Sequence, residues 1–384
     1  MSAPLRLNVL FLLFLLLSSA RVYGVVTATV VPAPPAIGAQ SHLLMDFHSG
    51  RILASSNPEA RMEPASLTKM MTTYVVFSEL TQGNIDLSDM VHVSERAWRM
   101  GGSKMFIEVD TEVSVEDLLK GLIIQSGNDA SVALAEFIAG EESSFADLMN
   151  KYASRMGLTG THFENASGMP SPDHYTTAKD MALLAAALIR DFPDLYKMHE
   201  EKSFEYNGIT QYNRNKLLWR DESVDGLKTG HTSSAGYCLV ASAERDGMRL
   251  ISVVLGSDSE RSRLTETNAL LSYGFRFFET HRLYEARQPV TEIRVWKGEV
   301  DTLGVGLTEA LYVTVPRGQY DKLKAKMEID NRVTAPVSEG ETRGQLHVTL
   351  AGEQLAQRPL IALRAVPEGN LWRQVSDHVR LLFK

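Results

Sequence analysis

A serine and a lysine three positions apart form the pattern in this sequence that best suits nucleophilic catalysis. Ser66 and Lys69 stand in Ser66-Leu67-Thr68-Lys69, after Pro64 and at the start of a run of good helix formers. Residues three apart share one face of a helix, so the Lys69 amine can lie beside the Ser66 hydroxyl. A serine hydroxyl is a weak nucleophile until a base takes its proton. We therefore expect Ser66 to be a nucleophile and Lys69 its general base.

Lys69 can act as a base only if its amine is neutral. The ordinary lysine pKa is about 10.4, so this amine would normally carry a proton at neutral pH. Burial and a nearby cation both disfavour the charged form. Lys228, in Lys228-Thr229-Gly230, is the cation that we expect near the pair, where its charge would also attract the substrate.

A second motif, Ser126-Gly127-Asn128, supplies another hydroxyl and an amide. We expect this motif in a loop between helices, where Ser126 relays a proton to the leaving amine and Asn128 binds an amide of the substrate. The negative charge that develops on oxygen during acyl transfer needs preorganised donors. The backbone N–H groups of Ser66 and His231 are the donors that we expect.

The third motif, Lys228-Thr229-Gly230, is expected on a strand that pairs with an extended peptide by strand addition. Gly230 would leave the edge of this strand unobstructed. Each motif is weak alone, and S-x-N recurs at Ser55-Ser56-Asn57. An isolated motif of this size would predict only a surface helix or turn, whereas three of them in order predict one site.

The segments around these motifs predict a sheet covered by helices. Apolar residues recur with helical spacing over 66–80, 115–124, 130–139, 144–156, 177–189 and 263–278. Strands are expected in a hairpin over 42–54, at 225–231, and in a second hairpin over 237–256 that turns at Asp246-Gly247. Strands at both ends with helices between them predict an α/β (α+β) domain over 41–280, with an antiparallel sheet and a helical cluster.

The last third of the chain has a different pattern of predicted secondary structure. Short strand candidates at 291–296, 311–315, 346–350 and 360–366 predict a small all-β domain over 281–367. The segment 368–384 is again helical, with Leu371, Val375, Val379 and Leu382 on one side. From the sequence alone, packing of this amphipathic helix against a domain is the simpler interpretation.

The N-terminus predicts export. Arg6 precedes an unbroken apolar run from Val9 to Leu17, followed by small residues, as in a secretory signal over 1–24. Cleavage after Ala20, Gly24 or Ala28 would fit equally well, and an uncleaved anchor is the alternative. The run is shorter than the roughly 17–25 apolar residues of a spanning helix. A proline-rich linker over 25–40 follows.

Composition excludes several classes of protein. The 384 residues have a net charge of −8 and therefore no basic footprint for nucleic acid. The single cysteine, Cys238, cannot form an internal disulfide and reads as a buried strand residue. The ten histidines have no metal-ligand spacing, so we expect no metal and no cofactor.

The three motifs resemble those of penicillin-binding proteins and serine β-lactamases. Their wider context resembles the low-molecular-mass D-alanyl-D-alanine carboxypeptidases, from about Ser41 to the C-terminus. The segments that carry this resemblance are 64–71, 125–130, 213–219, 225–232 and 274–279.

The resemblance implies a serine peptidase that removes the terminal D-alanine from peptidoglycan pentapeptides and is acylated by β-lactams. It also implies that Arg263, 11 residues before Gly274, binds the terminal carboxylate of the peptide with help from Thr229 and Thr232. The fold implied is a DD-peptidase-like catalytic domain, a β-rich second domain and a C-terminal helix on the membrane surface. The implied location is the periplasmic face of the inner membrane, with roles in cell-wall synthesis and cell shape.

One departure and two alternatives qualify this interpretation. In well-known relatives a histidine precedes Gly168, whereas this chain has Ser167. A class A-like β-lactamase would need a deacylating base, and Glu164 stands in the expected region without the E-x-x-L-N pattern. A non-catalytic wall-binding protein would be expected to lack one of the motif residues, and here Ser66, Lys69, Ser126 and Lys228 are all present.

Overall fold

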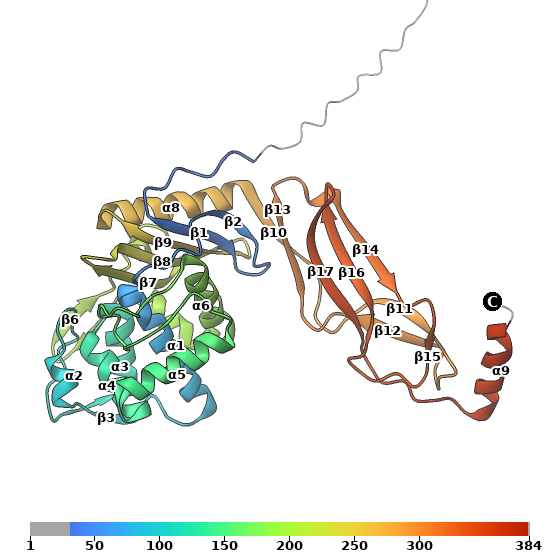
Figure 1. Cartoon of the computed structure of the whole chain (residues 1–384), viewed down its shortest axis with the longest axis horizontal. Coiled ribbons are helices and arrows are strands. Elements are labelled where there is room, and N and C mark those ends of the chain that lie inside the picture. Colours follow the sequence, from blue (N-terminus) through green and yellow to red (C-terminus); the bar gives the residue numbers. More distant parts are fainter. Residues whose placement is uncertain (1–30, 383–384) are drawn as a thin grey trace, which may run out of the picture.

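The computed structural model describes residues 31–382. The predicted secretory signal lies outside the described residues. The described chain forms an N-terminal body with a sheet and helices, a C-terminal body of strands, and a final helix at the far end of the second body (Figure 1). Within residues 31–382, no helix combines the length and apolar character needed to cross a membrane.

A five-stranded antiparallel sheet organises the N-terminal body. Its strands are β1 (Ser41–Asp46), β2 (Ile52–Ser56), β7 (Val224–Thr232), β8 (Gly236–Arg245) and β9 (Met248–Ser257). Their order is β2-β1-β9-β8-β7, which leaves β7 at one edge. Both predicted hairpins and the predicted strand at 225–231 are therefore confirmed.

Each face of the sheet carries its own core because alternate strand residues point to opposite sides. Leu43 and Met45 of β1 pack into the core of the helical cluster, whereas Leu44 between them packs beneath α8 (Glu260–Phe277). Figure 1 shows α8 on one side of the sheet and the other helices on the opposite side.

The helical cluster contains α1 (Lys69–Gln82), α2 (Glu95–Arg99), α3 (Val115–Lys120), α4 (Asn128–Ala139), α5 (Glu142–Arg155), α6 (Ala178–Asp191) and α7 (Pro193–Tyr196). Two small hairpins, β3 (Met90–His92) with β4 (Glu112–Ser114) and β5 (Ser203–Tyr206) with β6 (Ile209–Tyr212), border it. The predicted helix over 115–124 ends as an α-helix at Lys120 and continues as a π-helical turn, Gly121–Gln125. A Cβ on Gly121 would lie 2.2 Å from Met105 Sδ, so a larger residue here would force the Met105 side chain to move.

The C-terminal body is all-β, as predicted. β10 (Phe278–Tyr284) pairs with β13 (Leu311–Pro316). A six-stranded sheet joins β14 (Leu323–Ile329), β16 (Thr342–Leu350), β17 (Glu353–Ala362), β12 (Thr302–Gly306), β11 (Pro289–Trp296) and β15 (Val333–Thr334) in that order. The predicted C-terminal helix is α9 (Leu371–Leu382).

Buried hydrogen bonds join the two bodies at the end of β1. Asp46 is fully buried and accepts hydrogen bonds from Ser49 N at 2.7 Å and Thr280 Oγ1 at 2.6 Å. Ser49 Oγ lies 2.6 Å from Thr314 Oγ1 on β13. Because the Asp46 carboxylate accepts from Ser49 in the N-terminal body and from Thr280 of β10, it ties β10 to the end of β1.

We expect Asp46→Ala to lower the free energy of unfolding by about 2–3 kcal/mol. The substitution leaves the Ser49 and Thr280 donors without the charged acceptor that they have in the wild-type protein. Urea unfolding followed by circular dichroism measures this change. Asp147→Ala, at an exposed position of α5, is the matched control and should change the free energy by less than about 0.5 kcal/mol. Equal losses in both variants would contradict the role given to Asp46.

Candidate active site

An open cleft of about 800 Å³ lies along strand β7 and the turn that precedes α1. Six of the predicted site residues line this cleft: Ser66, Ser126, Thr229, Gly230, His231 and Arg263. Lys69, Asn128 and Lys228 are buried beside it. The structure therefore brings together motifs that are widely separated in the sequence.

Ser66, the predicted nucleophile, lies in a 3₁₀ turn, Ala65–Thr68, that leads directly into α1. Lys69 is the first residue of α1, and its Nζ lies 3.1 Å from Ser66 Oγ. This is the contact that the three-residue spacing predicts. The Lys69 side chain is completely buried, so no water competes for its amine.

Burial lowers the pKa of Lys69 to about 7, against the smaller opposing effects of the Asp129 and Glu142 carboxylates. Desolvation disfavours the ammonium form because the charge loses its hydration. At neutral pH a large fraction of the Lys69 amine is therefore unprotonated and can act as a base. Burial, rather than a neighbouring cation, is the main cause of the shift.

Two further oxygens orient the Lys69 amine. Asn128 Oδ1 lies 2.7 Å from Lys69 Nζ, and the backbone carbonyl oxygen of Ser167 lies 2.6 Å from it. A neutral amine has two N–H bonds and one lone pair. When the two carbonyl-type oxygens accept both N–H bonds, the lone pair points to Ser66 Oγ, which is the direction that proton abstraction needs.

Lys228 and Ser126 form a second pair on the other side of the nucleophile. Lys228 Nζ donates to Ser126 Oγ at 2.8 Å and to Thr229 O at 3.1 Å. Burial, followed by the positive charges of Lys69 and Arg263, holds the pKa of Lys228 well below its usual range. A lysine with a lowered pKa releases a proton readily, so Lys228 can donate a proton to the Ser126 hydroxyl.

Ser126 occupies a strained backbone position. Its φ of 66° lies in the left-handed region, directly after the π-helical turn and before α4. The neighbouring amides hold it there, because Gly127 N donates to Gly121 O at 3.0 Å and Asn128 N donates to Ser103 O at 2.7 Å. Non-glycine residues with this φ are uncommon and concentrate at functional sites.

The predicted reason for Gly230 is wrong. A Cβ on Gly230 would lie 3.0 Å from Pro64 O and 3.3 Å from Ala65 Cβ, so it would point at the nucleophile turn and not along the free edge. Glycine lets β7 approach the turn that carries Ser66. The edge of β7 is open because β7 is the last strand of the sheet.

Arg263 projects from the first turns of α8 toward the cleft. Its side chain is buried, and its Nη1 donates to Gly230 O at 3.3 Å and Cys238 O at 3.4 Å. Its Nε is also buried and has no hydrogen-bond partner among the described residues. Glu260 lies 3.7 Å from Arg263 Nη2, so part of the guanidinium charge is available to a carboxylate in the cleft.

Two predicted substrate contacts lie differently from what we expected. Asn128 is buried, its Oδ1 lies 2.7 Å from Lys69 Nζ, and its Nδ2 donates to Gly101 O at 2.7 Å, so both ends of its amide have partners within the protein. Thr232 is not among the described residues that line the cleft. Its Oγ1 accepts from Ala235 N at 2.9 Å within the β7–β8 turn.

Several cleft residues were missed by sequence reasoning. Arg214 donates from Nη2 to Ser103 Oγ at 3.2 Å, and Lys216 Nζ lies 2.9 Å from Glu260 Oε1. Together with Arg263 they give the cleft a positive character that suits an anionic substrate. The sequence did contain a signal for these two residues, since both lie in the segment 213–219 that resembles the carboxypeptidases.

Cys238 is completely buried on β8, and burial raises the pKa of its thiol to about 11. The thiol is therefore unreactive, which confirms the interpretation of Cys238 as a small buried hydrophobe. Within residues 31–382, no group of three or more His, Cys, Asp or Glu side chains could hold a metal ion.

Comparisons with known proteins agree with this geometry. A family model described as D-alanyl-D-alanine carboxypeptidase matches residues 28–259, and one described as penicillin-binding protein 5, C-terminal domain, matches residues 278–368. The chain is 46% identical over 357 residues to D-alanyl-D-alanine carboxypeptidase DacC of Escherichia coli, covering 91% of this chain and 89% of the relative. It is 44% identical over 357 residues to DacA of Haemophilus influenzae, covering 91% of each.

Solved structures give the same result. The structure of penicillin binding protein 5 from H. influenzae matches with a TM-score of 0.85 and 45% identity, over 88% of this chain and 100% of that chain. Penicillin binding protein 6B from E. coli matches with a TM-score of 0.73 and 39% identity, over 87% and 98% of the two chains. The chain belongs to the D-alanyl-D-alanine carboxypeptidase family.

Proposed function

We infer that this protein is a serine-type D-Ala-D-Ala carboxypeptidase that trims peptidoglycan pentapeptides through an acyl-enzyme on Ser66. The observation that carries this conclusion is the 3.1 Å contact between Ser66 Oγ and the buried Lys69 amine, beside a cleft that Arg263 also lines. The relatives in the family are named for the same activity.

Acylation follows from the orientation of the amine. The lone pair of Lys69 Nζ takes the Ser66 proton while Ser66 Oγ attacks the carbonyl carbon between the two terminal D-alanines. The N–H groups of Ser66 and His231 bind the oxyanion. As the C–N bond breaks, Ser126 passes a proton to the leaving amine and is reprotonated by Lys228. The terminal D-alanine then leaves with a complete amino group.

Deacylation uses the same base. The proton that Lys69 took from Ser66 first replaces the one that Lys228 gave up, so that Lys69 is neutral again. Water then gives a proton to Lys69 and attacks the ester carbonyl, and Ser66 Oγ leaves and takes that proton back. β-Lactams enter the same path, because opening of their ring by Ser66 gives an ester that is released slowly. Two related structures are of penicillin-binding protein D2 from Listeria monocytogenes in its ampicillin-bound and cefotaxime-bound forms.

Substrate recognition divides between the edge of β7 and the cations. An extended peptide that pairs with Thr229 and His231 on this edge would place its free carboxylate near Arg263, with Thr229 beside it. We retain Thr232 and Asn128 as residues whose effect on binding is to be tested. The buried Nε of Arg263, unpartnered among the described residues, supports a carboxylate ligand.

A β-lactamase is less well supported. Glu164, the candidate deacylating base, is exposed and hydrogen-bonds with Ser171, and it is not among the described residues that line the cleft. A non-catalytic wall-binding protein would not need a lysine with a lowered pKa, and the lowered pKa of Lys69 therefore favours catalysis.

We propose that the enzyme works outside the cytoplasmic membrane and attaches to its outer surface through α9. Exposed apolar side chains cover one side of this helix, with Leu371 79% and Trp372 84% exposed. The other side faces the β domain, where Asp377 is buried and accepts from Lys297 N at 2.7 Å. A helix with one outward apolar face suits the surface of a bilayer.

The signal over 1–24, the linker over 25–40 and the boundaries 41–280, 281–367 and 368–384 complete this proposal. Removal of terminal D-alanine limits the donors for wall cross-linking. A role in cell-wall synthesis and cell shape follows from that chemistry.

Ser66→Ala should lower the release of D-alanine from a pentapeptide by about 10⁴-fold or more, because it removes the hydroxyl that forms the acyl-enzyme. Labelling by a fluorescent penicillin should disappear with it. Ser55→Ala, in the exposed S-x-N sequence of β2, is the matched control and should keep both activities. Release at the wild-type rate by Ser66→Ala would exclude this mechanism.

The acylation rate should depend on the protonation of Lys69. Below a pH of about 7 the amine is protonated and cannot act as a base, so kcat/KM should fall about tenfold for each further pH unit. Above that pH the Lys69 amine is already neutral, so the acylation rate should stop rising with pH. Measuring penicillin acylation against pH tests this expectation, and a rate that stays constant on the acid side would contradict it.

Leu371→Ser combined with Trp372→Ser should weaken binding to vesicles of anionic phospholipid by about tenfold or more, because it removes two large apolar side chains from the interface. Co-sedimentation measures this binding. Tyr320→Ser, at an exposed aromatic position elsewhere in the C-terminal body, should leave it unchanged. Equal binding by all three proteins would refute attachment through α9.

A further inference from the structure

The Ser167 carbonyl that accepts from Lys69 belongs to a loop, residues 164–170, between α5 and α6. This loop has no helical or strand hydrogen bonds of its own. Its position must therefore come from side chains that bind its backbone. The question is which side chains hold the Ser167 carbonyl within 2.6 Å of the base.

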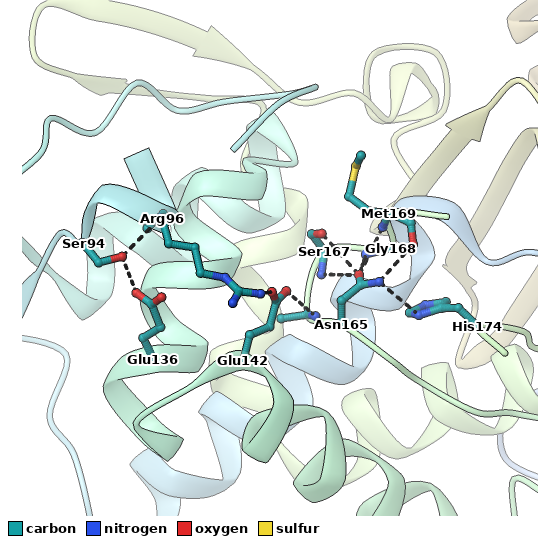
Figure 2. A network of polar contacts seen from close by, with 11 residues as sticks. Ser94, Arg96, Glu136, Glu142, Asn165, Ser167, Gly168, Met169 and His174 are labelled. Atoms are coloured by element: carbon teal, nitrogen blue, oxygen red, sulfur yellow. Dashed lines mark hydrogen bonds and ion pairs between the residues drawn. The ribbon is translucent and has the colours of Figure 1, made fainter. Parts of the chain in front are cut away.

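Asn165 organises the tip of the loop. Its Oδ1 accepts from the backbone N–H groups of Ser167 at 3.2 Å, Gly168 at 2.7 Å and Met169 at 3.1 Å. Its Nδ2 donates to Met169 O at 2.9 Å. Figure 2 shows the Asn165 amide at the centre of these contacts. One side chain thus fixes the direction of three successive peptide groups, including the one that joins Ser167 to Gly168 and contains the Ser167 carbonyl.

His174 ties the start of the loop to the nucleophile turn. Its Nδ1 lies 3.0 Å from Glu164 N and 3.4 Å from Asn165 Nδ2, and both of these groups are donors. Nδ1 must therefore be the unprotonated nitrogen, which leaves the proton on Nε2. Nε2 then donates to Thr68 Oγ1 at 2.7 Å, next in sequence to Lys69. Burial lowers the pKa of His174 to about 4, which keeps this neutral form at physiological pH.

The remaining contacts press the loop against α1. Thr72 Oγ1 donates to Ala166 O at 2.7 Å, and Ala166 N donates to Glu142 Oε1 at 3.1 Å. Arg96 holds the other oxygen of Glu142 at 2.6 Å (Figure 2). A Cβ on Gly168 would lie 1.8 Å from Ala65 O, so the loop fits closely against the nucleophile turn.

We propose that Asn165 and His174 are positioning residues for catalysis, which hold the Ser167 carbonyl against Lys69 Nζ and so aim the amine lone pair at Ser66. This role rests on the carboxypeptidase function proposed above. Neither side chain touches the reacting atoms, and both act through the Ser167 carbonyl. The interpretation that competes with it is a loop whose hydrogen bonds stabilise the fold alone.

The test compares four variants by their rate of acylation with a fluorescent penicillin across a range of pH. Asn165→Ala removes the amide that binds the three backbone N–H groups of the loop, and His174→Ala removes the hydrogen bond to Thr68. His174→Gln is the rescue variant, because its amide oxygen can accept from Glu164 N while its amide nitrogen donates to Thr68. Asn150→Ala is the control, since Asn150 makes two bonds to the backbone of Phe163, just before the loop, at 2.9 and 2.8 Å.

We expect Asn165→Ala and His174→Ala to slow acylation by about 10- to 100-fold, because a shift of the base by about 1 Å is enough for such a loss. The midpoint of the pH profile should also move upward, because water reaches the Lys69 amine and restores its proton affinity. The charged groups around that amine, Asp129, Glu142 and Lys228, are the same in all variants.

His174→Gln should recover most of the rate and the wild-type midpoint. Asn150→Ala should lower the melting temperature while its acylation rate and midpoint stay at wild-type values. Wild-type rates and midpoints in Asn165→Ala and His174→Ala, or an equal slowing in Asn150→Ala, would overturn the proposal. If one alanine variant fails to fold, the comparison of the other with wild type and His174→Gln decides. Absence of labelling in the wild-type enzyme would instead refute the proposed function.

Discussion

The site depends on a lysine amine that is removed from water and still surrounded by oxygen atoms. Lys69 Nζ has three such neighbours, on Ser66, Asn128 and Ser167, at 3.1, 2.7 and 2.6 Å. Desolvation lowers the pKa of the amine, so that it is largely unprotonated at neutral pH and can accept a proton, and the two carbonyl-type oxygens set its direction. A buried amine without these acceptors would be badly placed, and an exposed amine with them would remain charged.

Each large element of the N-terminal body has a part in meeting this constraint. Helix α1 presents the amine, α4 begins with Asn128, and the loop after α5 supplies the Ser167 carbonyl. Strand β7 closes the opposite side with Lys228, and glycine at 230 allows it to approach the nucleophile turn. The sheet and α8 then place Arg263 along the same cleft, where we propose that it binds the free carboxylate of the peptide.

The sequence allowed the fold class and the reactive groups to be predicted because both depend on local spacing. Ser66 and Lys69 are three residues apart, and alternating strands with amphipathic helices identify a covered sheet. The helix predicted over 115–124 was right in place and wrong in its last turn, which is π-helical over Gly121–Gln125 and packs closely against Met105.

The parts that could not be predicted depend on tertiary contact. The Ser167 carbonyl is a backbone group, so the type of residue at this position does not predict its contact with Lys69. A serine in place of the expected histidine still provides this carbonyl. The contact of Asn128 with Lys69 could not be predicted because it joins positions 59 apart in the chain. Gly230 looked like a gap for substrate because the sequence does not show that the nucleophile turn lies behind it.

The burial of Lys69 also couples folding to proton binding. The pKa of this amine is about 7 in the folded chain, against an ordinary value of 10.5 that the unfolded chain would have. Between these two pH values the unfolded chain binds a proton that the folded chain does not, so the free energy of unfolding from this group rises with pH across that window. Near pH 7 the enzyme therefore holds its base at the expense of its own stability. The rest of the protein must supply that difference, and the two buried cores of the N-terminal body are where it can come from.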